Sequence, residues 1–135
     1  MDVRQKTTIL VLDDEPIVCK RLKPYLEKNG YEVEVFTDSS KAMERVMEKD
    51  FDIVITDLKM EGIDGMTFLT RVKEKSPATQ VIVITGFATM ETARQSFQKG
   101  VFDFIAKPFK LSEIYEIVRR AEKKLRQEAL QDTGA

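Results

Sequence analysis

Short runs of apolar and β-branched residues alternate along this chain with longer segments whose apolar residues recur at helical spacing. Four of the five short runs are almost continuously apolar, which is typical of parallel strands that are covered on both faces. The second run alternates polar with apolar residues, so it is predicted to lie at a sheet edge. The five predicted strands span residues 8–12, 31–36, 51–56, 81–85 and 102–106.

Proline and glycine mark the ends of the helical segments. Pro16 stands in the first turn of the first helix, and Asn29-Gly30 predicts where that helix ends. Pro24 falls inside it, where proline removes a backbone hydrogen bond at a cost of about 3 kcal/mol, so a kink is predicted there. Further helices are predicted over about residues 39–49, 66–75 and 90–99, and from residue 111 onward.

This order of elements predicts an α/β fold, a five-stranded parallel sheet in a doubly wound three-layer sandwich. Each crossover between parallel strands must be right-handed and must pack its helix on one face of the sheet. The 135 residues fit one domain, and no repeat or linker interrupts the chain before residue 110. We expect the domain to occupy residues 1–122, with residues 123–135 as an extension of the last helix and a polar tail.

Composition excludes several classes of function. No apolar run approaches the roughly 20 residues of a membrane span, and the amino terminus lacks the apolar core of a signal peptide, so a cytoplasmic protein is expected. The chain has no histidine, which removes Ser-His and Cys-His catalysis, and its single Cys19 cannot form an internal disulfide. A net charge of −1 lacks the basic excess needed for direct binding to nucleic acid.

Chemically active side chains follow the predicted strands where those strands end. Asp13-Asp14 follow the first strand, Asp57 the third and Lys107 the fifth, and Thr85 closes the fourth. Carboxyl ends of parallel strands meet at one edge of a sheet, which is where such folds bind ligands. Clustered carboxylates repel one another unless a cation neutralises them, and Mg²⁺ fits because it binds carboxylates and phosphate oxygens together. The set predicts a site for phosphoryl transfer.

Each of these residues also has an ordinary interpretation. Asp13-Asp14 can cap the following helix, Asp57 can be one loop acid among several, and Thr85 can bond to the backbone. Lys107 before Pro108 can be a solvated charge. The five residues favour a site only as a set.

The chain resembles a two-component response-regulator receiver across roughly residues 7 to 122. In that family the strand order is 2-1-3-4-5. The resemblance rests on four stretches, which are Leu10-Val11-Leu12-Asp13-Asp14-Glu15, Asp57-Leu58-Lys59-Met60 with Gly62-Ile63-Asp64-Gly65, Ile84-Thr85-Gly86, and Phe104-Ile105-Ala106-Lys107-Pro108-Phe109.

The resemblance implies roles for these residues. Asp57 would be the phosphoacceptor, attacking the phosphohistidine of a sensor histidine kinase. Asp14, Asp57 and the backbone carbonyl of Lys59 would bind Mg²⁺ directly, and Asp13 through a water. Lys107 would pair with the acid at rest and with a phosphoryl oxygen afterwards, and its bond to Pro108 would be cis.

The resemblance also implies a switch. Thr85 would turn toward the new phosphoryl group, and Phe104 would follow into the vacated space, changing the surface of the fourth helix, fifth strand and fifth helix. A homodimer through that surface is one expected outcome. Simple core packing is the alternative role for Phe104.

Three positions depart from the commoner family pattern. Glu61 stands where proline is frequent, which suggests a more mobile and more acidic loop. Lys59 and Phe87 occupy places that tune attack of water on the acyl phosphate, and neither positions a water in an obvious way. A long-lived phosphoryl group is therefore hypothesised.

The last helix carries an apolar stripe that has two interpretations, a short coiled-coil seam or a solvated terminal helix. Its members are Ile114, Ile117, Val118, Ala121 and Leu125, and four of them, without Ile117, have the spacing of a coiled-coil seam. Two nearby segments, 86–88 and 100–104, resemble receivers attached to sigma-54-dependent AAA+ activators, in which such a helix leads to an output domain. The chain is then either a stand-alone regulator or an excised receiver.

Two other classes share parts of this pattern. A phosphatase of the haloacid dehalogenase type would need a general acid two residues beyond its nucleophile, where this chain has Lys59. A flavodoxin-like module would need a hydroxyl- and glycine-rich phosphate loop after the first strand, where Asp13-Asp14-Glu15 would repel that phosphate.

Overall fold

The computed structural model describes residues 5–60 and 62–134, and the side chains as far as residue 131. Five strands form one parallel sheet in the order β2-β1-β3-β4-β5, which confirms the predicted fold and the edge position of β2. The strands are β1 (Thr8–Leu12), β2 (Glu32–Phe36), β3 (Ile53–Thr56), β4 (Gln80–Thr85) and β5 (Asp103–Ala106). The helices are α1 (Pro16–Lys28), α2 (Ser39–Glu48), α3 (Gly65–Lys75), α4 (Met90–Gln98) and α5 (Leu111–Gly134).

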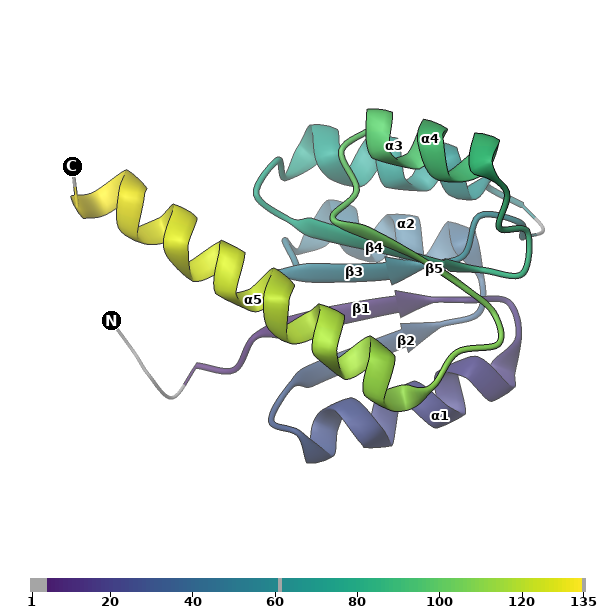
Figure 1. Ribbon diagram of the computed structural model, residues 1–135, viewed down its shortest axis with the longest axis horizontal. Coiled ribbons are helices and arrows are strands. Elements are labelled where there is room, and N and C mark those ends of the chain that lie inside the picture. The colour runs from purple at the N-terminus through teal and green to yellow at the C-terminus, as the bar shows by residue number, and fades with distance from the viewer. Residues whose placement is uncertain (1–4, 61, 135) are drawn as a thin grey trace.

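Helices cover both faces of the sheet, as Figure 1 shows, with α1 and α5 on one side and α2, α3 and α4 on the other. Successive residues of a strand point to opposite faces. Accordingly Ile9 and Val11 belong to the core under α1 and α5, and Leu10 and Leu12 belong to the core under the other three helices. This two-sided burial explains why the central strands are almost continuously apolar.

Capping residues mark the starts and ends of helices close to the predicted positions. The side chain of Asp38 accepts hydrogen bonds from the backbone N–H groups of Ser40 and Lys41, at 2.8 and 3.2 Å. Gly30 follows α1 with a φ of 98°, a conformation that glycine adopts without strain. Pro24 lies inside α1, and the kink predicted there stays a prediction.

The apolar stripe of α5 packs into the domain and not against a partner helix. Ile114, Val118 and Ala121 have no exposed surface, and Leu125 packs against the same core. The coiled-coil interpretation is therefore wrong for this stripe, because its side chains already cover the sheet. Beyond it, α5 continues past the end of the sheet (Figure 1). In the part of the chain that the structure describes, no helix is both long and apolar enough to cross a membrane.

Candidate functional site: an acidic cleft at the strand ends

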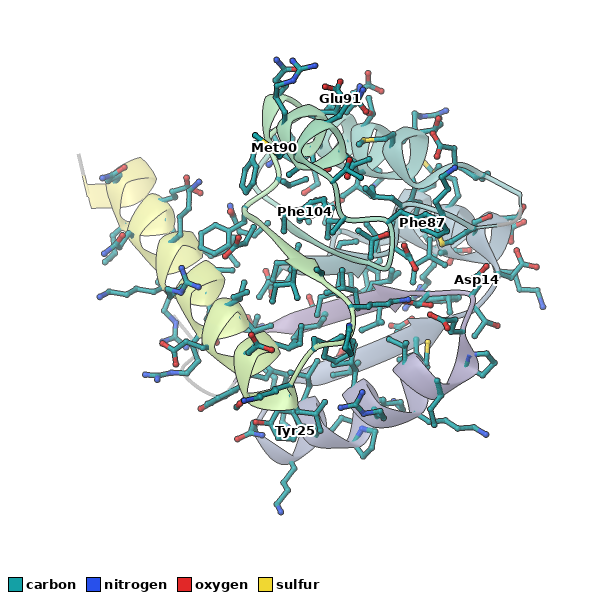
Figure 2. The ribbon with its side chains drawn as sticks, turned by 45° about the vertical axis from the view of Figure 1, so that its right-hand side comes forward. Asp14, Tyr25, Phe87, Met90, Glu91 and Phe104 are labelled. Atoms are coloured by element: carbon teal, nitrogen blue, oxygen red, sulfur yellow. The ribbon has the colours of Figure 1, made fainter. Side chains whose placement is uncertain are left out.

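The backbone ladder of the sheet continues one residue past the strands and fixes the site residues. The N–H of Asp13 donates to the carbonyl of Phe36, and the N–H of Asp57 donates to the carbonyl of Leu12, both at 3.1 Å. The N–H of Lys107 donates to the carbonyl of Thr85 at 2.8 Å. Residues from four strands are thereby brought to one edge of the sheet, and Figure 2 shows Asp14 at this edge.

Three carboxylates converge there. Asp13, Asp14 and Asp57 each offer an oxygen, and these oxygens all lie within 4.8 Å of one another. Asp13 is fully buried and Asp57 nearly so, whereas Asp14 is exposed. Burial raises the pKa of Asp13 despite the nearby ammonium of Lys107 and the hydrogen bond from the N–H of Glu15.

The two oxygens of Asp57 have different surroundings. Its Oδ1 accepts hydrogen bonds from the backbone N–H groups of Leu58 and Lys59, at 2.6 and 3.3 Å. Its Oδ2 accepts from the ammonium of Lys107 at 2.8 Å. The backbone therefore fixes the orientation of the carboxylate, and Oδ2 is the oxygen whose partner is a side chain that can move.

Lys107 contacts three acids. Its Nζ lies 2.8 Å from an oxygen of Asp13 and 2.8 Å from Asp57, and it also donates to Glu15. Burial lowers the pKa of this ammonium, but the three carboxylates outweigh burial, and the net effect is a raised pKa. Lys107 therefore stays protonated at any physiological pH. Its peptide bond to Pro108 is cis, as the family resemblance implied.

Thr85 ends β4, and Phe104 lies on the neighbouring strand β5. Thr85 is fully buried, and its hydroxyl accepts a hydrogen bond from the N–H of Phe87 at 3.0 Å. Phe104 is partly buried against the core under α4, and Figure 2 shows it beneath that helix. The resting structure thus has the Thr85 hydroxyl bonded to backbone, which is the ordinary role considered for it.

The residues around Asp57 line an open cleft of about 820 Å³. Lys59 lies with its Nζ 5.4 Å from the ring centre of Phe87 on one side of the cleft. On the other side the guanidinium of Arg21 lies 5.0 Å from the ring centre of Phe109. Sequence reasoning missed Glu15 and Arg21 as members of this site. Glu15 had one available signal, its place directly after Asp13-Asp14. Glu61 lies outside the described residues.

This donor set fits a hard divalent cation. Oδ2 of Asp13 is buried, and although Lys107 lies near it, the contact lacks the geometry of a hydrogen bond. An orphaned buried carboxylate oxygen beside two further carboxylates is costly unless positive charge compensates it. Oxygen donors of this kind suit Mg²⁺.

Comparison with known proteins identifies the family. A family model for the response regulator receiver domain matches residues 9–119. The chain belongs to this family. The resemblance seen in the sequence is therefore confirmed, and so is the receiver fold. Receivers of two-component systems accept a phosphoryl group from histidine kinases and bind Mg²⁺ in an acidic pocket, and Asp13, Asp14 and Asp57 form such an acidic group here.

Individual relatives and solved structures support the same family assignment. The receiver is 33% identical over 119 residues to the transcriptional regulatory protein ZraR of Salmonella typhimurium, across 88% of the chain and 27% of that relative. It resembles a receiver domain from Clostridium thermocellum with a TM-score of 0.82 and 29% identity, covering 93% of this chain and 98% of the other. It resembles NtrX from Brucella abortus with a TM-score of 0.89 and 26% identity, covering 97% of this chain and 30% of NtrX. The chain thus spans about a quarter of the length of ZraR.

Proposed function

We propose that Asp57 accepts a phosphoryl group from the phosphohistidine of a sensor histidine kinase. The observation that carries the proposal is the asymmetry of its carboxylate, with Oδ1 held by backbone N–H groups and Oδ2 held by Lys107 in an open cleft. An oriented carboxylate oxygen beside a cation is what in-line attack on phosphorus requires.

In this mechanism Oδ2 of Asp57 forms the new bond to phosphorus as the bond from phosphorus to the imidazole nitrogen breaks. The electron pair stays on the imidazole. Lys107 balances the charge on the phosphoryl oxygens, since its raised pKa keeps it protonated. Asp13, Asp14, Asp57 and the carbonyl of Lys59 would hold Mg²⁺, which supplies further positive charge to those oxygens.

The proposed readout runs through Thr85 and Phe104. The hydroxyl of Thr85 would leave the N–H of Phe87 and bond to the phosphoryl group, and Phe104 would move inward from under α4. The face of α4, β5 and α5 would change, where Met90 and Phe97 of α4 are exposed. A homodimer or a downstream protein would then bind this face.

The domain boundary fits the same proposal. Glu122 accepts hydrogen bonds from Thr7 and from the hydroxyl of Tyr31, which ties α5 to the start of the sheet. We propose that the receiver ends near this residue and that the rest of α5, as far as Gly134, extends toward an output domain. Because ZraR is named a transcriptional regulatory protein, we propose that this output regulates transcription.

Mass spectrometry after incubation with acetyl phosphate and Mg²⁺ tests the proposal. The expected result is a gain of one phosphoryl group on the wild type and none on Asp57→Asn. An unmodified wild type, or equal modification of both proteins, would contradict it. Turnover of a phosphomonoester would instead favour the phosphatase class, which Lys59 in the general-acid position argues against.

A further inference from the structure

Lys107 has one more carboxylate partner than its proposed role uses. A lysine ammonium has three N–H donors, and here three acids surround it. Asp13 and Asp57 belong to the proposed metal and phosphoryl sites. Glu15 lies two residues after Asp13, directly before α1, and lines the cleft without a role in binding the metal or accepting the phosphoryl group.

The three acids differ in how firmly they are held. The side chain of Asp13 has no exposed surface and that of Asp57 has 5%, whereas that of Glu15 is 57% exposed. Asp13 and Asp57 also accept backbone hydrogen bonds that fix their carboxylates. Among the described residues, no backbone N–H donates to the Glu15 carboxylate, whose hydrogen-bond partner is Lys107 itself. Glu15 is therefore the partner that Lys107 can exchange.

Glu15 also determines the charge of the cleft. Among the described residues that line it, three are acids (Asp14, Glu15, Asp57) and three are cations (Arg21, Lys59, Lys107), and the buried Asp13 adds a fourth acid beside Lys107. An anionic phosphodonor thus meets protein groups with no excess of positive charge, and loss of the Glu15 charge would make them less negative. The Glu15 carboxylate accepts a hydrogen bond from the Lys107 ammonium, and a phosphoryl oxygen would need that same N–H donor.

We propose that Glu15 is a positioning residue that competes with the incoming phosphoryl group for Lys107 and so sets how readily Asp57 is phosphorylated. The proposal rests on the proposed phosphoacceptor function. In the resting state Glu15 holds the ammonium. When a donor enters, its phosphoryl oxygen replaces the Glu15 carboxylate on Lys107, and Glu15 turns into solvent.

The test compares Glu15→Gln with the wild type. The initial rate of phosphorylation of Asp57 is measured by intact-protein mass spectrometry across acetyl phosphate concentrations, at saturating Mg²⁺ and at low and high ionic strength. Glu15→Gln should lower the half-saturating concentration about two- to fivefold, the size of one exposed charge interaction, with a smaller change in maximal rate. High salt should shrink the difference.

Glu44→Gln is the matched control, because it removes the same charge from an exposed position on α2. It should behave as the wild type. Equal half-saturating concentrations for Glu15→Gln and wild type, an equal shift in Glu44→Gln, or a change confined to the maximal rate would each overturn the competition. Absence of phosphorylation in the wild type would instead overturn the phosphoacceptor function itself.

Discussion

At the scale of single residues, Gly65 shows how tightly the site loop is built. A Cβ on Gly65 would lie 2.3 Å from the carbonyl oxygen of Asp57 and 2.5 Å from Cα of Leu58. Both atoms are backbone, so neither can move without displacing the acceptor. The start of α3 therefore packs directly on the loop that carries Asp57.

We expect Gly65→Ala to lower the free energy of unfolding by about 1–3 kcal/mol and to slow phosphorylation of Asp57. Urea unfolding and mass spectrometry measure the two effects. Gly86→Ala is the control for stability, since a Cβ there meets nothing within 4 Å. Equal stability of the two variants would show that the loop after Asp57 yields easily.

Phe87 is one of the two residues, with Lys59, on which the hypothesis of a long-lived phosphoryl group rests. Its ring lies beside Lys59 at the cleft and is 55% exposed, so it can limit the approach of water to an acyl phosphate. We expect Phe87→Ala to hydrolyse the phosphoryl group severalfold faster than the wild type, followed as loss of the phosphorylated mass. Phe97→Ala, an exposed ring on α4, should leave the decay unchanged. Fast decay in the wild type would contradict the hypothesised long lifetime.

At the scale of elements, one ion pair joins α2 to the edge strand β2. Arg45 donates to both oxygens of Glu34, at 2.8 and 2.9 Å, and each side chain is about two-thirds buried. This hydrogen bonding lowers the pKa of Glu34. The pair's contribution to stability is therefore complete above the pKa of the unfolded chain, about 4.3, and is lost as the pH falls through the lower folded value.

Arg45→Ala should cost about 0.5–1.5 kcal/mol of unfolding free energy at pH 7, and less as the pH approaches 3. Arg94→Ala is the comparison, because Arg94 and Glu91 lie on one helix with 57% of each side chain exposed. Arg94→Ala should lower the free energy of unfolding by no more than about 0.5 kcal/mol. A pH-independent loss in Arg45→Ala would mean that packing against Phe51, and not the charge, carries the effect.

At the scale of the whole molecule, the acidic cleft is a place where function opposes stability. Burial raises the pKa of Asp13, so the folded protein binds a proton at pH values where the unfolded chain has lost it. Stability from this group therefore falls as the pH rises from about 3.9 through the raised pKa. Positive charge in the cleft would reverse that loss.

We expect Mg²⁺ to raise the melting temperature at pH 7 or above and to have little effect near pH 4. In Asp13→Asn, Mg²⁺ should raise the melting temperature much less than in the wild type. Without Mg²⁺, the stability of Asp13→Asn should fall less than that of the wild type between pH 4 and 7. Differential scanning calorimetry across pH measures both. Equal stabilisation by Mg²⁺ at pH 4 and pH 8 would place the ion away from these carboxylates.

The sequence by itself determined the order of the elements, the parallel sheet and the meeting of Asp13, Asp57, Thr85 and Lys107 at one edge. Local periodicity and turn residues settle these features, because strand ends in a parallel sheet share one edge. The acidic group of Asp13, Asp14 and Asp57 was predicted from the same strand-end positions.

Only the tertiary structure decided which partners these side chains take. In the structure Lys107 donates a hydrogen bond to Glu15, and the Thr85 hydroxyl accepts one from the backbone N–H of Phe87. The apolar stripe of α5 is buried in the core. A sequence pattern gives the spacing of side chains along one element, and a helix with an apolar stripe looks the same whether a sheet or a second helix covers it. Which surface covers it, and which acid reaches a shared lysine, depends on elements that are far apart in the chain.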